Sequence, residues 1–135
     1  MKVYAVSEDD VVYFDSIVEC RNWIKSKGFR NENPPEVWNV YRVGEYDSDG
    51  DAYALESYDI RDYASYIVDG GRYRKFATTS MADARRIARR EANSSGVRVP
   101  IYAIGEYFYP PHSVLEFVEP KGNESRPVQR KGTRR

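Results

Sequence analysis

The stretch Val40–Tyr46 (VYRVGEY) decides the fold, because a close copy of it recurs 61 positions later as Ile101–Tyr107 (IYAIGEY). Four of the seven positions are identical, and two of the other three keep a β-branched apolar residue. Residues of this kind are typical of half-buried strands, so each copy is predicted to be a strand. We interpret the pair as the visible part of an internal duplication.

The segments around the two copies repeat one order of predicted elements, namely two strands, a helix and two more strands. Each helix begins at a serine in a capping motif, Ser16 in the first copy and Ser80 in the second. The predicted strands of the first copy cover residues 2–7, 11–14, 37–43 and 52–58. Those of the second copy cover residues 66–68, 72–77, 97–107 and 114–118.

Alignment of the two copies predicts which residues occupy equivalent places. Tyr66–Val68 is matched with Tyr4–Val6, and Phe76 is matched with Phe14. The remaining matches are Cys20 with Ala84 and Leu55–Glu56 with Leu115–Glu116.

These patterns predict an α+β fold. We expect a tandem β-β-α-β-β repeat (2–58 and 64–119) with antiparallel sheets, two helices and internal pseudo-twofold symmetry, packed as one compact domain over 1–120. The connector 59–63 is expected to form a short helical turn. The tail 121–135 is basic and almost free of apolar residues, so it is predicted to be disordered.

The charges balance over the whole chain, with 21 basic and 21 acidic residues, but they are not evenly mixed. Residues 45–69 carry eight acidic residues and one Arg, whereas residues 72–90 carry seven basic residues and one Asp. Such separation bears on the choice of partners rather than on the fold.

Two candidate partner-binding surfaces follow from this separation. The basic candidate groups Arg72, Arg74, Lys75, Arg85, Arg86, Arg89 and Arg90, most of them on one arc of the second helix. The acidic and aromatic candidate groups Tyr46, Asp47, Asp49, Asp51, Tyr53 and Tyr58. Arginine suits phosphate or carboxylate partners, and tyrosine is a common interface anchor. A solvated helix face and two soluble hairpin strands are the plain alternatives.

The sequence offers no convincing catalytic or metal-binding set. Cys20 and His112 could be imagined as a nucleophile and its base, but Cys20 lies on the apolar side of its helix. Residues 47–51 together with Glu56 resemble a calcium loop, but the glycine and the glutamate stand at the wrong positions. We therefore expect no enzyme, no cofactor and no metal.

The location of the protein is predicted from what its sequence lacks. The start of the chain is strand-like rather than a signal peptide, and no apolar run approaches membrane-spanning length. We expect a cytoplasmic protein without membrane contact.

Two resemblances bear on function. Residues 4–20 resemble the start of ribonuclease H hybrid-binding domains, but the Lys-Phe-Ala-Thr strand that follows the first helix there comes some fifty residues later here, at 75–78, so no binding residues are carried over. The hairpin, capped helix and strand of both repeats look like small bacteriophage accessory proteins, which implies binding and blocking of host machinery or defence systems.

Our hypothesis is a non-enzymatic, phage-encoded inhibitor that binds a host or defence protein in the host cytoplasm. The alternatives left open are a nucleic-acid-binding module that uses the Arg-rich second helix and the basic tail, and sequestration of a small nucleotide. Formation of a homo-oligomer is also left open.

Overall fold

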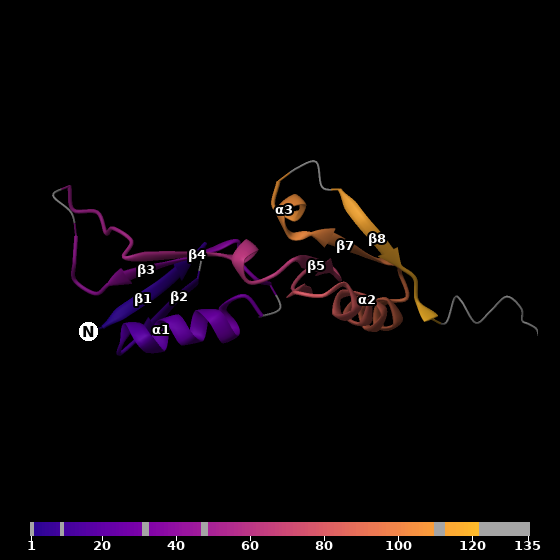
Figure 1. Cartoon of the computed structure of the whole chain (residues 1–135), viewed down its shortest axis with the longest axis horizontal. Helices are drawn as coiled ribbons and strands as arrows, with labels where there is room; N and C mark the ends of the chain where they lie inside the picture. Colours follow the sequence, from indigo (N-terminus) through magenta and orange to yellow (C-terminus); the bar gives the residue numbers. More distant parts are fainter. Residues whose placement is uncertain (1, 9, 31–32, 47–48, 110–112, 122–135) are drawn as a thin grey trace, which may run out of the picture. The chain divides into compact units, whose positions relative to one another are not determined.

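The computed structural model describes residues 2–8, 10–30, 33–46, 49–109 and 113–121, and its fold is α+β with two antiparallel four-stranded sheets (Figure 1). The chain divides into two compact units, unit 1 (Met1–Tyr63) and unit 2 (Ala64–Arg135), and each is described on its own. The packing of both repeats into one domain with a pseudo-twofold axis stays a prediction.

Unit 1 is a sheet with the strand order β2-β1-β3-β4. Its strands are β1 (Val3–Ser7), β2 (Asp10–Phe14), β3 (Val37–Arg42) and β4 (Glu56–Asp59). The helix α1 (Ile17–Trp23) continues into the π-helix η1 (Ile24–Gly28), and the 3-10 helix η2 (Ile60–Asp62) follows β4. The α1 side of the sheet forms the core, where Val3, Ala5, Cys20, Ile24 and Val40 are fully buried.

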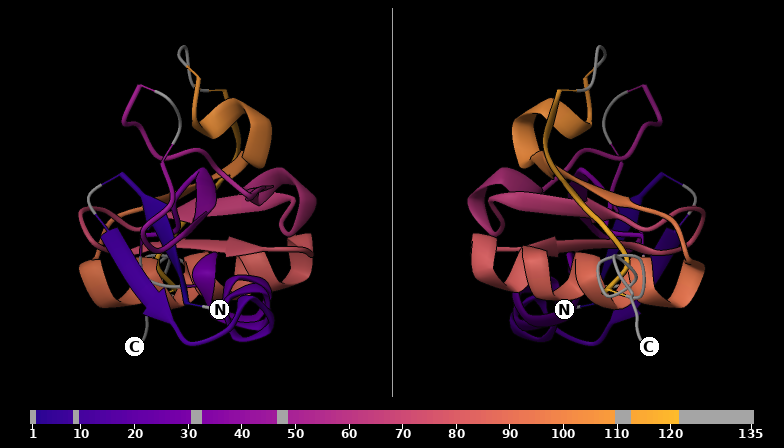
Figure 2. Two further views of the ribbon diagram at one scale, coloured as in Figure 1. Left: turned by 90° about the vertical axis from the view of Figure 1, so that its left-hand side faces the viewer. Right: turned by 90° about the vertical axis from the view of Figure 1, so that its right-hand side faces the viewer.

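Unit 2 has the same strand order, β6-β5-β7-β8. Its strands are β5 (Tyr66–Asp69), β6 (Lys75–Thr78), β7 (Val99–Ala103) and β8 (Val114–Val118). The helices α2 (Met81–Ser95) and the short α3 (Ile104–Tyr107) lie on opposite sides of these strands (Figure 2). The core packs Ala84, Ala88 and Ala92 of α2 against Val68 and Ile101.

Strand register places the two halves of the duplicated stretch in equivalent surroundings. Val40 pairs with Ala5 on one side and Glu56 on the other, while Ile101 pairs with Val68 and Glu116. This register agrees with the predicted match of Leu55–Glu56 and Leu115–Glu116.

The predicted match of the first hairpins is wrong by one to two residues. With Val40 and Ile101 equivalent, Tyr66–Val68 takes the place of Val3–Ala5, and Phe76 takes the place of Val12 instead of Phe14. The sequence could not fix this register because Ile67 and Val68, on opposite faces of β5, are both fully buried. Without apolar and polar alternation, a one-residue shift leaves no trace in the pattern.

The duplicated stretch itself is a strand only in its first half, which corrects the predicted strands 37–43 and 97–107. In unit 1 the chain turns at Gly44, whose φ is +82°, and Glu45 N–H donates to the Arg42 carbonyl at 3.3 Å. In unit 2 the residues that follow Ala103 form α3. The Ile104 N–H still donates to the carbonyl of Ser65 at 2.9 Å, but β5 begins just after Ser65, so no partner strand extends the ladder.

Two other predicted strands are shorter and shifted. The strand predicted at 52–58 is β4 at 56–59, and the strand predicted at 72–77 is β6 at 75–78. In the second case the hairpin loop is long, because the ladder closes at Asp69 and Lys75.

Both predicted helix starts are confirmed. The Ser16 hydroxyl accepts from Glu19 N–H at 3.2 Å, and the Ser80 hydroxyl accepts from Asp83 N–H at 3.0 Å. The predicted helical turn in the connector is confirmed as η2, where the Asp59 side chain accepts from Arg61 N–H at 2.9 Å. Of the tail predicted to be disordered, only Lys121 belongs to the described residues.

Candidate functional site

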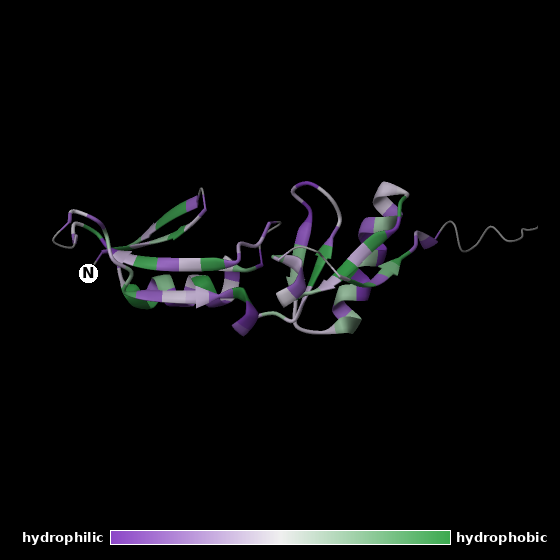
Figure 3. Cartoon of the chain, turned by 90° about the horizontal axis from the view of Figure 1, so that it is seen from above, coloured by the Kyte–Doolittle hydropathy of each residue, from purple (hydrophilic) through white to green (hydrophobic). Residues whose placement is uncertain are grey.

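The side of the unit 1 sheet that faces away from α1 is a tyrosine surface, and strand alternation creates it. Along β1, Val3, Ala5 and Ser7 point to the core, so Tyr4 and Val6 point to the opposite side. Figure 3 shows the alternation of hydrophobic and hydrophilic residues along these strands. We call this side the tyrosine face.

Three tyrosines form a row across three neighbouring strands of this face. Tyr4 lies directly opposite Tyr13 on β2 and Tyr41 on β3. The ring centroids of Tyr4 and Tyr41 are 5.3 Å apart and the planes are stacked, while those of Tyr4 and Tyr13 are 5.5 Å apart and tilted. We call these three residues the tyrosine row.

The row is exposed at one end and supported at the other. Tyr13 is 69% exposed, whereas Tyr4 and Tyr41 are half-buried. Burial, together with the neighbouring phenols of Tyr46, Tyr13 and Tyr41, raises the pKa of Tyr4. The central ring is therefore held between two others and keeps its proton at neutral pH.

The rest of the tyrosine face is smaller and partly polar. Val6 pairs with Val11, which is half exposed, and with Asn39. The Ser57 hydroxyl donates to the side-chain carbonyl of Asn39 at 2.5 Å. At the end of the face that is remote from the tyrosine row, Val6, Val37 and Asn39 line a shallow hollow together with Ser7 and the carboxylates of Glu8 and Glu36.

Charge separates between the two units. Unit 1 contains seven Lys and Arg against fourteen Asp and Glu, a formal charge of −7. Unit 2 contains fourteen Lys and Arg against seven Asp and Glu, a formal charge of +7. The tyrosine row therefore belongs to a strongly acidic unit.

The acidic and aromatic residues singled out from the sequence have different surroundings where the structure describes them. Tyr46 and Tyr53 are well exposed, and the Tyr53 hydroxyl lies 3.4 Å from a carboxylate oxygen of Glu45. Tyr58 lies opposite the buried Trp38, and its hydroxyl donates to Glu56, so it belongs to the α1 side. Asp49 and Asp51 are exposed, whereas Asp47 lies outside the described residues.

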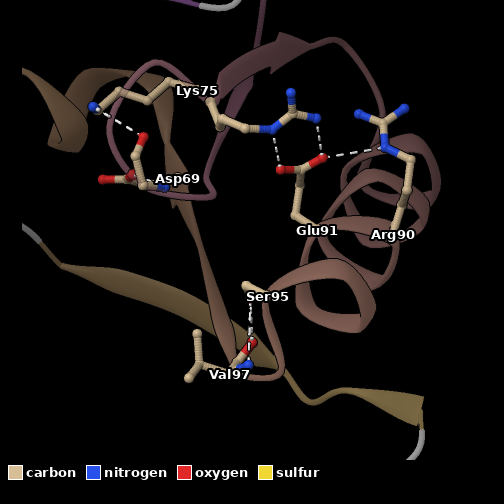
Figure 4. A network of polar contacts seen from close by, with 8 residues as sticks. Asp69, Lys75, Arg90, Glu91, Ser95 and Val97 are labelled. Carbon is tan, nitrogen blue, oxygen red and sulfur yellow. Dashed lines mark hydrogen bonds and ion pairs between the residues drawn. The ribbon is translucent and has the colours of Figure 1, made fainter.

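The basic residues singled out on unit 2 are largely engaged with the unit's own carboxylates. Arg74 donates to both oxygens of Glu91, at 2.6 Å through Nε and 2.7 Å through Nη2. Arg90 Nε lies 3.3 Å from the same carboxylate (Figure 4). Both guanidinium groups also lie over the Phe76 ring, at 5.4 and 5.1 Å from its centroid.

The Glu91 carboxylate is the centre of this network. Its side chain is only 5% exposed although it is charged. The hydrogen bonds from Arg74, supported by Arg90, hold the pKa of Glu91 below its ordinary value against the opposing effect of burial. The network joins α2 to Arg74, the residue just before β6.

Arg85 makes a bidentate pair with Glu116 of β8, with contacts of 2.9 to 3.2 Å. The same pair occurs in unit 1, where Arg21 of α1 makes a bidentate pair with Glu56 of β4. Each pair ties a helix to the edge strand of its sheet. The repeated arginine thus has a structural role in both units.

The other basic candidates have different surroundings. Arg86 lies 3.4 Å from Asp83, and Lys75 donates to the carbonyl of Gly71 at 3.3 Å. Arg72 lies over the exposed ring of Tyr73, 5.0 Å from its centroid. Arg89 is half-buried on α2.

Of the two residues considered for catalysis, the structure describes Cys20. Cys20 is fully buried, and burial, with a smaller effect of Glu56, raises the pKa of its thiol to about 11. His112 lies outside the described residues, as do Asp47 and Ser48 of the calcium-like loop. Within the described ranges, no group of three or more His, Cys, Asp or Glu side chains could hold a metal ion.

In the same ranges, no helix is long and apolar enough to cross a membrane.

The tyrosine row is the feature that reasoning from the sequence missed. The signal was present, because Tyr4 stands between Val3 and Ala5 in a predicted strand, and Tyr13 and Tyr41 each occupy another predicted strand of the same repeat. Period-two alternation places Tyr4 on the side opposite two small apolar residues. Assigning the register of the three strands would have brought the tyrosines together.

Comparison of the chain with protein family models, with curated proteins and with solved structures found no match.

Proposed function

We propose that this chain is a non-enzymatic protein-binding module that acts through the tyrosine face of unit 1. The observation that carries the proposal is the row of Tyr13, Tyr4 and Tyr41, whose rings contact one another across three strands. Tyrosine contributes a large contact area and has few side-chain torsions to order on binding. Stacking of Tyr4 on Tyr41 restricts both rings before a partner arrives.

The finer proposal is that binding inhibits a host or defence protein by covering its surface. A surface made of a sheet and of preordered rings suits this role, since affinity rises when little is left to order. This target class follows from the resemblance to small bacteriophage accessory proteins.

The nucleic-acid alternative is supported by the formal charge of +7 on unit 2. Against it, Arg74, Arg85, Arg86 and Arg90 of the basic candidate surface lie within ion-pair distance of carboxylates of their own unit. A phosphate would have to compete with those pairs. Binding that falls steeply with rising salt would support this alternative.

Site-specific crosslinking tests the proposed function. A photoreactive phenylalanine derivative replaces Tyr13 on the tyrosine face or, as a control, the exposed Val18 on α1. In cells that naturally make the protein, we expect a discrete protein adduct from position 13 and not from position 18. Adducts from position 18 alone, or from neither position, would contradict the proposal.

A further inference from the structure

The aromatic rings of the two units differ in what lies over them. In unit 2, Arg72 covers Tyr73, and Arg98 lies 3.9 Å from the centroid of the Phe117 ring. Within the described part of the chain, by contrast, no arginine or lysine stacks on Tyr4, Tyr13 or Tyr41. The rings of the tyrosine row contact one another and leave Tyr13 open to solvent.

The electrostatic setting of the row favours a cationic ligand. Unit 1 carries a formal charge of −7. The carboxylate of Glu8 borders the tyrosine face at its hollow, beside Glu36, which pairs with Arg61 at 2.7 Å. Near the row, Asp15 and Glu19 line a second hollow that Tyr13 and Lys2 share. A negative field of this kind attracts a cation and repels a phosphate backbone.

We propose that the tyrosine face of unit 1 binds an arginine-bearing segment of its protein partner. One guanidinium lies on the exposed ring of Tyr13, and a second reaches the carboxylate of Glu8 at the hollow. Arginine fits better than lysine, because its planar group stacks on a ring and pairs with a carboxylate through two hydrogen bonds. This inference rests on the proposed function and adds the chemistry of the partner.

Peptide titration of the full chain tests the inference. The probes are hexaarginine, hexalysine, hexaglutamate and oligodeoxythymidylate, each titrated at low salt while amide signals of β1, β2 and β3 are followed by nuclear magnetic resonance. We expect shifts with hexaarginine that are centred on these strands, weaker binding of hexalysine, and no shifts there with the two anionic probes.

Three variants separate ring stacking from general charge attraction. Tyr13→Ala should weaken hexaarginine binding roughly 2- to 5-fold, as loss of one exposed cation–π contact implies. Tyr13→Phe keeps the ring and should leave the affinity unchanged within about a factor of two. Tyr73→Ala removes an exposed tyrosine of unit 2 and should have no effect on binding to unit 1.

The outcomes also separate this inference from the proposed function. If oligodeoxythymidylate or hexaglutamate shifts these strands and hexaarginine does not, the inference is overturned. Equal binding of hexaarginine by Tyr13→Ala and by the wild type overturns it as well. If position 13 still yields a protein adduct under either result, the protein-binding function stands and only the arginine preference fails.

Discussion

Replacement of the buried Glu91 by glutamine should destabilise unit 2 by removing the charge at the centre of its polar network. The carboxylate, 5% exposed, accepts two hydrogen bonds from Arg74 at 2.6 and 2.7 Å and lies 3.3 Å from Arg90 Nε. A glutamine side chain has one acceptor oxygen, and its amide group would turn two donors toward the guanidinium of Arg74. The two hydrogen bonds that Arg74 donates to Glu91 of α2 could then no longer both form.

The size of the stability loss in Glu91→Gln follows from how exposed its two arginine partners are. Breaking a fully buried ion pair by removing one member costs about 3–5 kcal/mol. Here Arg74 and Arg90 are 48% and 54% exposed, so water can solvate them after the change. We therefore expect a loss of about 2 kcal/mol in the free energy of unfolding, close to that of a hydrogen bond to a charged group.

The assay is urea denaturation followed by far-ultraviolet circular dichroism, with Glu116→Gln as the matched control. Glu116 forms a bidentate pair with Arg85, but this pair is much more exposed than the Glu91 pair. Its loss should therefore lower the free energy of unfolding far less. Equal losses in the two variants would refute the reasoning, because burial of the carboxylate would then have no energetic consequence.

The pH dependence of the same pair gives a second check. Because the Arg74 hydrogen bonds lower the pKa of Glu91 from its ordinary 4.5, the native state favours the ionised carboxylate. Its contribution is fully present above pH 4.5 and is lost as pH falls through the lowered native pKa. The difference in the free energy of unfolding between the wild type and Glu91→Gln should therefore shrink as the pH falls below 4.5 and through the lowered native pKa.

Three further predictions concern single residues. Gly96→Ala should cost about 1 kcal/mol in the free energy of unfolding, because Gly96 ends α2 at a φ of +79°. Thermal unfolding would measure this loss, and an unchanged midpoint temperature would contradict the left-handed cap. Trp38→Phe should lower the free energy of unfolding by about 1–3 kcal/mol, because the Gly28 carbonyl loses its buried 2.8 Å hydrogen bond from the indole N–H. Urea denaturation followed by circular dichroism would measure this loss, and an unchanged stability would contradict the role of the bond. The Cys20 thiol, buried and with a pKa of about 11, should react with a disulfide reagent at pH 8 only after urea is added, and fast labelling of the native protein would contradict its burial.

The sequence was most informative where local signals determine the structure. Ser16 and Ser80 predicted the starts of both helices correctly. Each serine hydroxyl accepts a hydrogen bond from the backbone N–H three residues later, and this local contact does not depend on the rest of the fold. The α+β class and the order of strands and helices followed from the same local patterns. The match of Glu56 with Glu116 also holds, and the structure adds that each glutamate pairs with a helix arginine.

The errors arose where distant parts of the chain decide the outcome. Residues Ile104–Tyr107 read as strand, but β5 begins at Tyr66 and offers no partner beyond Ser65, so they form α3. The arginines of α2 were interpreted as a surface for ligands. One of their carboxylate partners, on β8, is distant in the sequence and comes close only in the folded chain. The tyrosine row was missed for the same reason, because its members lie on three strands and Tyr4 and Tyr41 are 37 positions apart in the sequence.

The most direct test of the tyrosine face is the affinity for the partner that crosslinks at position 13, measured by calorimetry for the wild type and two variants. We predict that the combined change Val11→Ala and Tyr13→Ala, both at exposed positions of the tyrosine face, weakens binding by roughly 30-fold or more, as loss of an interface hot spot implies. Tyr73→Ala, at a tyrosine of unit 2 that is 61% exposed, should leave the affinity unchanged. Equal affinities for the wild type and the combined variant, with both proteins folded, would contradict the assignment of the tyrosine face as the binding surface.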